Sequence, residues 1–140
     1  MKRKRRWVVL GGVAILVLLA IAWYKWPVKL TEVDTSEVGL IVLLDGTTGN
    51  RAEISDAETI SRLMKEFCSV KMQKDGVSVY SAGYHIWVRV CKPDMEIVSD
   101  FCINGERMIR RDPFFYKVVG EDMDVEYLER LIKEAQETEE

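Results

Sequence analysis

The chain has 140 residues, of which 20 are basic and 23 acidic, for a formal net charge of −3. Six of the basic residues and none of the acidic ones precede residue 27, so the remaining 114 residues hold 14 basic against 23 acidic side chains, a net charge of −9. That length suits one compact domain. Its acidity argues against nucleic acid and anionic wall or lipid polymers as ligands, and favours solubility or cationic partners.

The first 26 residues predict a membrane anchor. A basic stub, residues 1–6, precedes an uncharged run, residues 7–24. As a helix rising ~1.5 Å per residue, this run is about 27 Å long, close to the ~30 Å hydrocarbon core. Aromatic residues at both of its ends suit the headgroup level. We therefore place a transmembrane helix at residues 7–26.

The basic stub predicts the orientation of this span. By the positive-inside rule, the amino terminus stays in the cytoplasm of a single-pass protein and the domain lies outside the cell membrane. A cleaved secretory signal, cut after Ala20-Ile21-Ala22, is the alternative. The apolar run continues through that site into Trp23 and Tyr24. This continuity favours the uncleaved anchor.

The first part of the domain predicts a stalk, a hairpin and a helix. Residues 27–37 are polar and begin with proline, so we expect a stalk, with the extracytoplasmic domain at 38–140. Residues 38–45 and 51–54 flank turn residues and predict a hairpin. Ser55 and Glu58 form a capping box that begins a helix. The helix would bury one apolar stripe: Ile60, Leu63, Met64 and Phe67.

The middle of the domain predicts a meander of strands. Lys74-Asp75-Gly76 indicates a turn within residues 71–80, before a weak strand with Val77 and Val79. Alternation along residues 84–91 and 96–103 predicts two half-buried strands. A Lys92–Met95 loop pairs them as Cys91 with Glu96, Val90 with Ile97, Val88 with Ser99 and Ile86 with Phe101. Asn104-Gly105 then predicts a two-residue hairpin turn, which places Met108 opposite Phe101 on the core face.

The last part of the domain predicts one more strand and one more helix. Asp112-Pro113 ends the preceding strand, and residues 114–119 are rich in aromatic and branched side chains. A final helix opens at 122–124. Its predicted inward residues are Val125, Leu128, Ile132 and Ala135, with Tyr127 and Leu131 at the margin. The predicted fold is α+β, an antiparallel sheet of four to six strands with two packed helices behind the transmembrane helix.

The cysteines and the histidine offer little chemistry. Cys68, Cys91 and Cys102 are interpreted as small buried hydrophobes, with a disulfide from Cys68 as the alternative. With no CxxC motif and a single histidine, we expect no metal site. The predicted register places His85 opposite Cys102, so a Cys–His pair is geometrically conceivable. It lacks a helix amino terminus or an oxyanion loop, and we expect no catalytic residue and no cofactor.

The non-core face of the meander carries the candidate binding residues. Trp87, Asp100 and Ile109 would form a row across three strands, flanked by Arg89 and Arg107. A tryptophan among arginines and aliphatic residues suits two situations. Either the last helix covers this face, which we expect, or the face is exposed and binds through Trp87, Arg89, Asp100 and Arg107.

The order of these elements resembles a known kind of protein. A capped helix, a meander with an Asn-Gly turn, the FFYKVV strand and the helix VEYLERLIKE cover residues 54–133. In this pattern the chain is similar to small uncharacterised exported domains, lipoprotein or single-span, of Gram-positive bacteria. The resemblance implies an α+β fold and an envelope location, and it transfers no functional residue.

Three classes of function remain after this reading. We expect a membrane-anchored, non-catalytic binding or accessory module that acts on an envelope protein partner. The alternatives are a subunit that assembles membrane complexes through its span, and an envelope enzyme that uses the Cys–His pair.

The predicted topology can be tested with protease. Protease added to intact protoplasts should digest residues 27–140 and spare the cytoplasm, because the basic stub retains the amino terminus inside. Immunodetection of a tag at each terminus measures this. Protection of the carboxyl-terminal tag would mean the opposite orientation.

Overall fold

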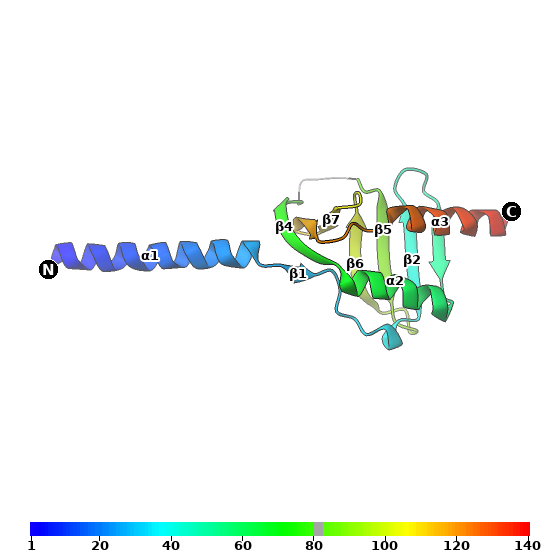
Figure 1. Ribbon diagram of the computed structural model, residues 1–140, viewed down its shortest axis with the longest axis horizontal. Helices are drawn as coiled ribbons and strands as arrows, with labels where there is room; N and C mark the ends of the chain where they lie inside the picture. Colours follow the sequence, from blue (N-terminus) through cyan, green and yellow to red (C-terminus); the bar gives the residue numbers. More distant parts are fainter. Residues whose placement is uncertain (80–82) are drawn as a thin grey trace.

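The computed structural model consists of a single α+β domain and a helix that projects away from it (Figure 1). It describes residues 1–79 and 83–140. The helices are α1 (Lys2–Lys25), α2 (Ala57–Ser69) and α3 (Val125–Glu139), with a 3-10 turn, η1 (Thr35–Glu37). The strands are β1 (Val28–Lys29), β2 (Leu40–Asp45), β3 (Arg51–Ile54), β4 (Lys71–Val77), β5 (Ile86–Cys91), β6 (Ile97–Ile103), β7 (Met108–Arg111) and β8 (Phe114–Val119).

All eight strands belong to one antiparallel sheet, in the order β1-β4-β8-β7-β6-β5-β2-β3. The predicted α+β class, with an apolar amino-terminal helix, an antiparallel sheet and two further helices, is confirmed. The sheet has more strands than predicted. Helix α1 is long and apolar enough to cross a membrane, and none of the residues in its apolar window is buried.

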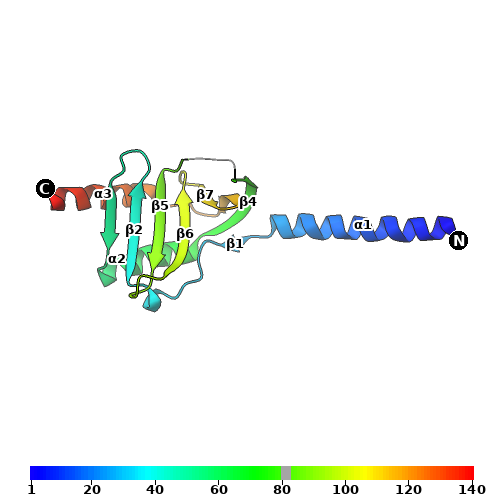
Figure 2. The ribbon, with the colours of Figure 1, turned by 180° about the vertical axis from the view of Figure 1, so that it is seen from behind.

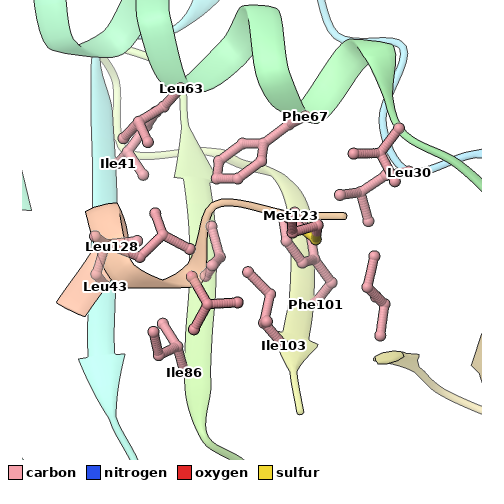
Figure 3. Close-up of a cluster of buried hydrophobic side chains, with 14 of the residues drawn as sticks. Leu30, Ile41, Leu43, Leu63, Phe67, Ile86, Phe101, Ile103, Met123 and Leu128 are labelled. Atoms are coloured by element: carbon pink, nitrogen blue, oxygen red, sulfur yellow. The ribbon is translucent and has the colours of Figure 1, made fainter. Parts of the chain in front are cut away.

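The core lies between one face of the sheet and the two helices α2 and α3 (Figure 3). The predicted stripe of α2 is fully buried, and Phe67 meets Phe101 of β6 edge to face, with ring centroids 5.3 Å apart. Helix α3 buries Val125, Tyr127, Leu128 and Ile132. Tyr127 is therefore a core residue, whereas the pattern had placed it at the margin.

Helix α2 begins one residue later than predicted. Its N-cap is Asp56, whose Oδ2 accepts a hydrogen bond from the amide of Thr59 at 2.9 Å. The capping box from Ser55 is therefore wrong. Serine and aspartate both cap helices, but the aspartate also places a negative charge at the positive end of the helix dipole.

Residues 27–37 were predicted as a stalk, and this is wrong for their central part. Val28 and Lys29 form β1, which pairs with Met72 and Lys71 of β4. Leu30 is only 1% exposed and belongs to the main core. The segment is polar on average, but its apolar residues alternate, and alternation is enough to pack an edge strand.

The register between β5 and β6 differs from the prediction by two residues. Val88 pairs with Phe101 and Ile86 with Ile103. Cys91 pairs with Ile97, so the loop is one residue longer than predicted, and Val98 adds a second residue at a bulge between the pairs Val90–Ser99 and Cys91–Ile97. A shift of two keeps each side chain on its predicted face, so Ile86, Val88 and Phe101 still share the core. Ile97, predicted to be inward, is 49% exposed.

The connection from β6 to β7 is longer than the predicted two-residue turn. Ile103 pairs with Ile109, so Ile109 is fully buried and Met108 is 42% exposed. This shift is odd, and it reverses the predicted core position of Met108 and outward position of Ile109. The longer loop is held by the segment before α3, since the amide of Met123 donates to the carbonyl of Glu106 at 2.9 Å.

Strand β4 contains the predicted turn Lys74-Asp75-Gly76 as an irregularity within the strand. Its register against β8 shifts between Lys74 and Val77, and Gly76 has a φ of +120°. A glycine tolerates that conformation, so the strand bends instead of ending. Tyr80, the predicted end of this segment, lies outside the described residues.

The observed register makes a testable prediction about stability. Ile109→Ala should lower the free energy of unfolding by about 2–5 kcal/mol, because it leaves a cavity in a fully buried site. Met108→Ala, its neighbour on the outer face, should change it by roughly 0.5 kcal/mol or less. Denaturant unfolding of the full chain in detergent measures both. A larger loss of stability for Met108→Ala than for Ile109→Ala would support the predicted two-residue turn instead.

Candidate binding surface

Within residues 1–79 and 83–140, helices cover only one face of the sheet. The view in Figure 2 shows the strands in front, with α2 and α3 behind them. Along β2 and β5 the buried residues alternate with half-buried ones, namely Val42, Leu44, Trp87 and Arg89. Together with Arg51 and Glu53 of β3 and Asp100 and Cys102 of β6, these outward residues form what we call the open face. The expected cover of Trp87 by the last helix is wrong, because α3 packs on the opposite face.

A shallow pocket of about 230 Å³ lies on the open face. Its lining is apolar except for two arginines: Val42, Leu44, Arg51, Trp87, Arg89, Cys91, Met95 and Ile97. Bulky apolar side chains on a surface, with charged groups at the edge, are typical of sites that bind another molecule. The pocket therefore gives the open face a defined centre.

Trp87 is held in place by its neighbours at this centre. Its indole Nε1–H donates to a carboxylate oxygen of Asp100. The other oxygen of Asp100 is 3.6 Å from Nη2 of Arg89, whose guanidinium carbon lies 4.5 Å from the indole centroid. Tyr84 packs against the indole edge to face at 5.7 Å. A tryptophan fixed in this way loses little side-chain entropy on binding.

Arg89 has hydrogen-bonding capacity that the described chain does not use. Its Nε is buried and has no hydrogen-bond partner among the described residues. Its side chain as a whole is 37% exposed, and its one ion pair, with Asp100, is long. A guanidinium presents five donors in a planar fork that matches carboxylates. The exposed part of this fork can donate hydrogen bonds to a carboxylate or carbonyl oxygen of another molecule.

Arg107, the fourth predicted binding residue, lies elsewhere. It forms an ion pair with Asp122 and donates to the carbonyls of Gly120 and Val118, at 3.3 and 3.1 Å. These bonds tie the β6–β7 loop to the segment before α3. The predicted grouping of Arg107 with Trp87 is wrong, because the longer loop removes Arg107 from the open face.

Sequence reasoning missed the apolar part of the pocket. Val42 and Leu44 belong to the continuous apolar run at residues 38–45, and an unbroken run does not distinguish the inward residues of a strand from the outward ones. The structure buries Ile41 and Leu43 completely and leaves the alternate residues on the open face. The available signal was the two-residue period of a strand, which turns alternate residues of the run toward the opposite face.

The Cys–His pair is not formed. Cys102 lies opposite Trp87 and Arg110, whereas Nε2 of His85 is 2.8 Å from a carboxylate oxygen of Glu129 on α3. Burial raises the pKa of the Cys102 thiol, and it also raises the pKa values of Cys68 and Cys91. All three are free thiols in the structure. Within residues 1–79 and 83–140, no three side chains of the metal-ligating types come together.

Comparisons of the chain with protein-family models, with curated proteins and with solved structures gave no match.

The thiols allow a test of pH dependence. Because burial raises their pKa values, less thiolate is present at a given pH, and alkylation by iodoacetamide should reach its half-maximal rate at a higher pH than for a free cysteine. Mass spectrometry of each cysteine peptide, with the urea-unfolded chain as control, measures this. A midpoint for Cys102 at or below that of the unfolded chain would indicate an activated thiol.

Proposed function

We propose that this chain is a non-catalytic binding module, held at the cell membrane by α1, that captures a protein partner through the pocket around Trp87. One observation carries the proposal. The face that bears Trp87 has no helical cover and is hollowed into an apolar pocket with two arginines. Tryptophan and arginine are the residues that most often dominate the energy of protein interfaces.

The pocket chemistry indicates what the partner presents. Val42, Leu44 and Ile97 suit one or two apolar side chains, since burying each adds roughly 1.5–3 kcal/mol. Arg89 and Arg51 lie beside them, and Arg51 already contacts Glu53. We infer a partner surface with an apolar side chain next to a carboxylate or an exposed carbonyl.

The proposed location is outside the cytoplasm. The basic stub at residues 1–6 supports this orientation, because cytoplasmic flanks carry the excess of lysine and arginine. With the span at 7–26, the domain then faces the envelope side, where a protein partner would meet it. The resemblance to exported Gram-positive domains agrees with this location.

A role in assembling membrane complexes through the span is the second proposal. The observation in its favour is that α1 leaves its apolar side chains exposed, including Leu10, Leu16 and Leu18 at 60% or more. Lipid alone also covers such a surface, so an experiment is needed to distinguish a partner helix from lipid. The open-face pocket has a defined shape and is therefore the preferred site.

Site-specific photocrosslinking tests the main proposal. A benzoylphenylalanine at Leu44 of the full chain, in the membrane of its own cells, should form a discrete product with one protein. Trp87→Ala should reduce the yield about tenfold or more, because it removes the aromatic anchor of the pocket. Met108→Ala is the matched control, an exposed apolar residue on β7 away from the pocket, and should leave the yield unchanged.

Other outcomes would contradict the proposal. Absence of a product from Leu44, together with products from probes along α1, would favour assembly through the span. Equal losses from Trp87→Ala and Met108→Ala would mean that the capture does not depend on the pocket.

A further inference from the structure

One edge of β6 has no strand partner along most of its length. Strand β7 pairs with β6 only at Cys102 and Ile103. From Ile97 to Phe101, β6 pairs with β5 on one side, and no strand of the described chain pairs with it on the other. Alternate backbone N–H and C=O groups of these residues therefore point away from the sheet without a strand to meet them.

A second unpaired edge faces this one. Strand β1 pairs only with β4, and it ends the sheet. The sheet curls strongly. Strands β4 and β8 lie between β1 and β7, yet Nη1 of Arg111 on β7 donates to the carbonyls of Leu30 at 2.9 Å and Lys29 at 3.4 Å. This curl brings residues 28–33 across from β6.

A slot of about 1000 Å³ separates the two edges. Residues 26–33 line one side and residues 98–100 the other, together with Lys71 and Arg111. An extended chain placed in the slot would find backbone donors and acceptors along β6. Addition of a strand to an exposed edge is a common mode of peptide recognition, in which main-chain hydrogen bonds supply affinity.

We infer that this slot binds an extended segment of a partner protein by strand addition along β6. The site is separate from the pocket around Trp87. Asp100 lies between them, because it lines the slot and accepts the hydrogen bond from the Trp87 indole. It uses backbone groups, whereas the pocket uses side chains. The inference therefore stands whether or not the pocket captures a partner.

Two lysines indicate the charge of this segment. Lys29 and Lys71 are directly opposite each other in the β1–β4 pair, and both line the slot, which also contains Glu32 and Asp100. Asp100 is already engaged by Trp87 and Arg89. Neither lysine forms an ion pair with any acidic residue of the described chain. Like charges in directly opposed positions are unfavourable, and an acidic side chain on the bound segment would relieve them. The expected ligand is thus an extended segment with at least one aspartate or glutamate.

The slot also lies next to the end of α1. Tyr24 accepts a hydrogen bond from the amide of Gly76 at 2.9 Å, and the Gln73 side-chain amide donates to the carbonyl of Lys25 at 2.5 Å. Trp23 and Tyr24 both pack edge to face on Phe114. The last turn of α1 is therefore docked on β4 and β8, and the slot begins one residue later, at Trp26. Segments of other proteins that emerge from the same membrane surface can reach it.

Peptide display provides the experiment. A library of random nonapeptides is selected on the full chain in lipid nanodiscs, with empty nanodiscs removed first. We expect enriched peptides that carry an acidic residue and are rich in strand-forming residues. Bound peptide should slow hydrogen exchange at the amides between Ile97 and Phe101. N-methylation of alternate peptide amides can be applied in two phases, at the odd or at the even positions. It should weaken binding about tenfold or more in one of these phases, because it removes the main-chain donors that face β6.

Charge reversal supplies the matched variants. The double variant Lys29→Glu and Lys71→Glu should reverse the selection from acidic to basic peptides, since both side chains are exposed and their loss leaves the core intact. Lys65→Glu, exposed on α2, should change nothing. Circular dichroism confirms that each variant is folded.

Three outcomes would overturn the inference. The first is that no peptide is enriched over empty nanodiscs. The second is that enriched peptides tolerate N-methylation in both phases or ignore the charge reversal. The third is that binding is lost with Leu44→Glu and unaffected by reversal of the two lysines, which would assign the peptides to the pocket around Trp87 and so support the proposed function alone.

Discussion

The contact between Phe67 of α2 and Phe101 of β6 determines which side of the sheet is buried. It joins the helical layer to the middle of the sheet, and the two-residue period of the strands then places Ile86 and Val88 on the same side. Helix α3 packs on this side as well. The two helices therefore leave the opposite face without helical cover, and the pocket around Trp87 is a direct result.

The curl of the sheet has a second consequence. Arg111 of β7 donates to the backbone carbonyls of Lys29 and Leu30 across the curled sheet, and Leu30, the residue after β1, enters the core. The chain that follows α1 is thus part of the domain from Val28 onward. Because β1 is short and β7 turns away from β6 early, the curled sheet does not close, and two strand edges face each other across the slot.

Local charge differs from the overall charge at both surfaces. The domain is acidic as a whole, which by itself favours cationic partners. The pocket nevertheless presents Arg89 and Arg51, and the slot presents Lys29, Lys71 and Arg111 against Glu32 and Asp100. At contact distance, a few neighbouring groups outweigh charges more than a Debye length away, about 8–10 Å at ordinary ionic strength. Both proposed ligands are accordingly acidic or rich in acceptors, in a domain whose net charge alone would indicate the reverse.

The sequence alone determined the apolar amino-terminal helix from the length of its uncharged run. It also determined the α+β class, the buried stripe of α2 and the core face of β5, because each depends on a local periodicity of 3.6 or 2 residues. Tertiary structure decided what depends on distant contacts. A loop one residue longer than predicted and the bulge at Val98 together moved the β5–β6 pairing by two residues. Hydrogen bonds that join Glu106 to Met123 and Arg107 to Val118 hold the longer turn that buries Ile109. Trp87, Arg89 and Asp100 were correctly placed on one face. Whether that face was covered depended on where α3 packs. The sequence could not decide this, because the apolar stripe of α3 fits either side of a sheet equally well.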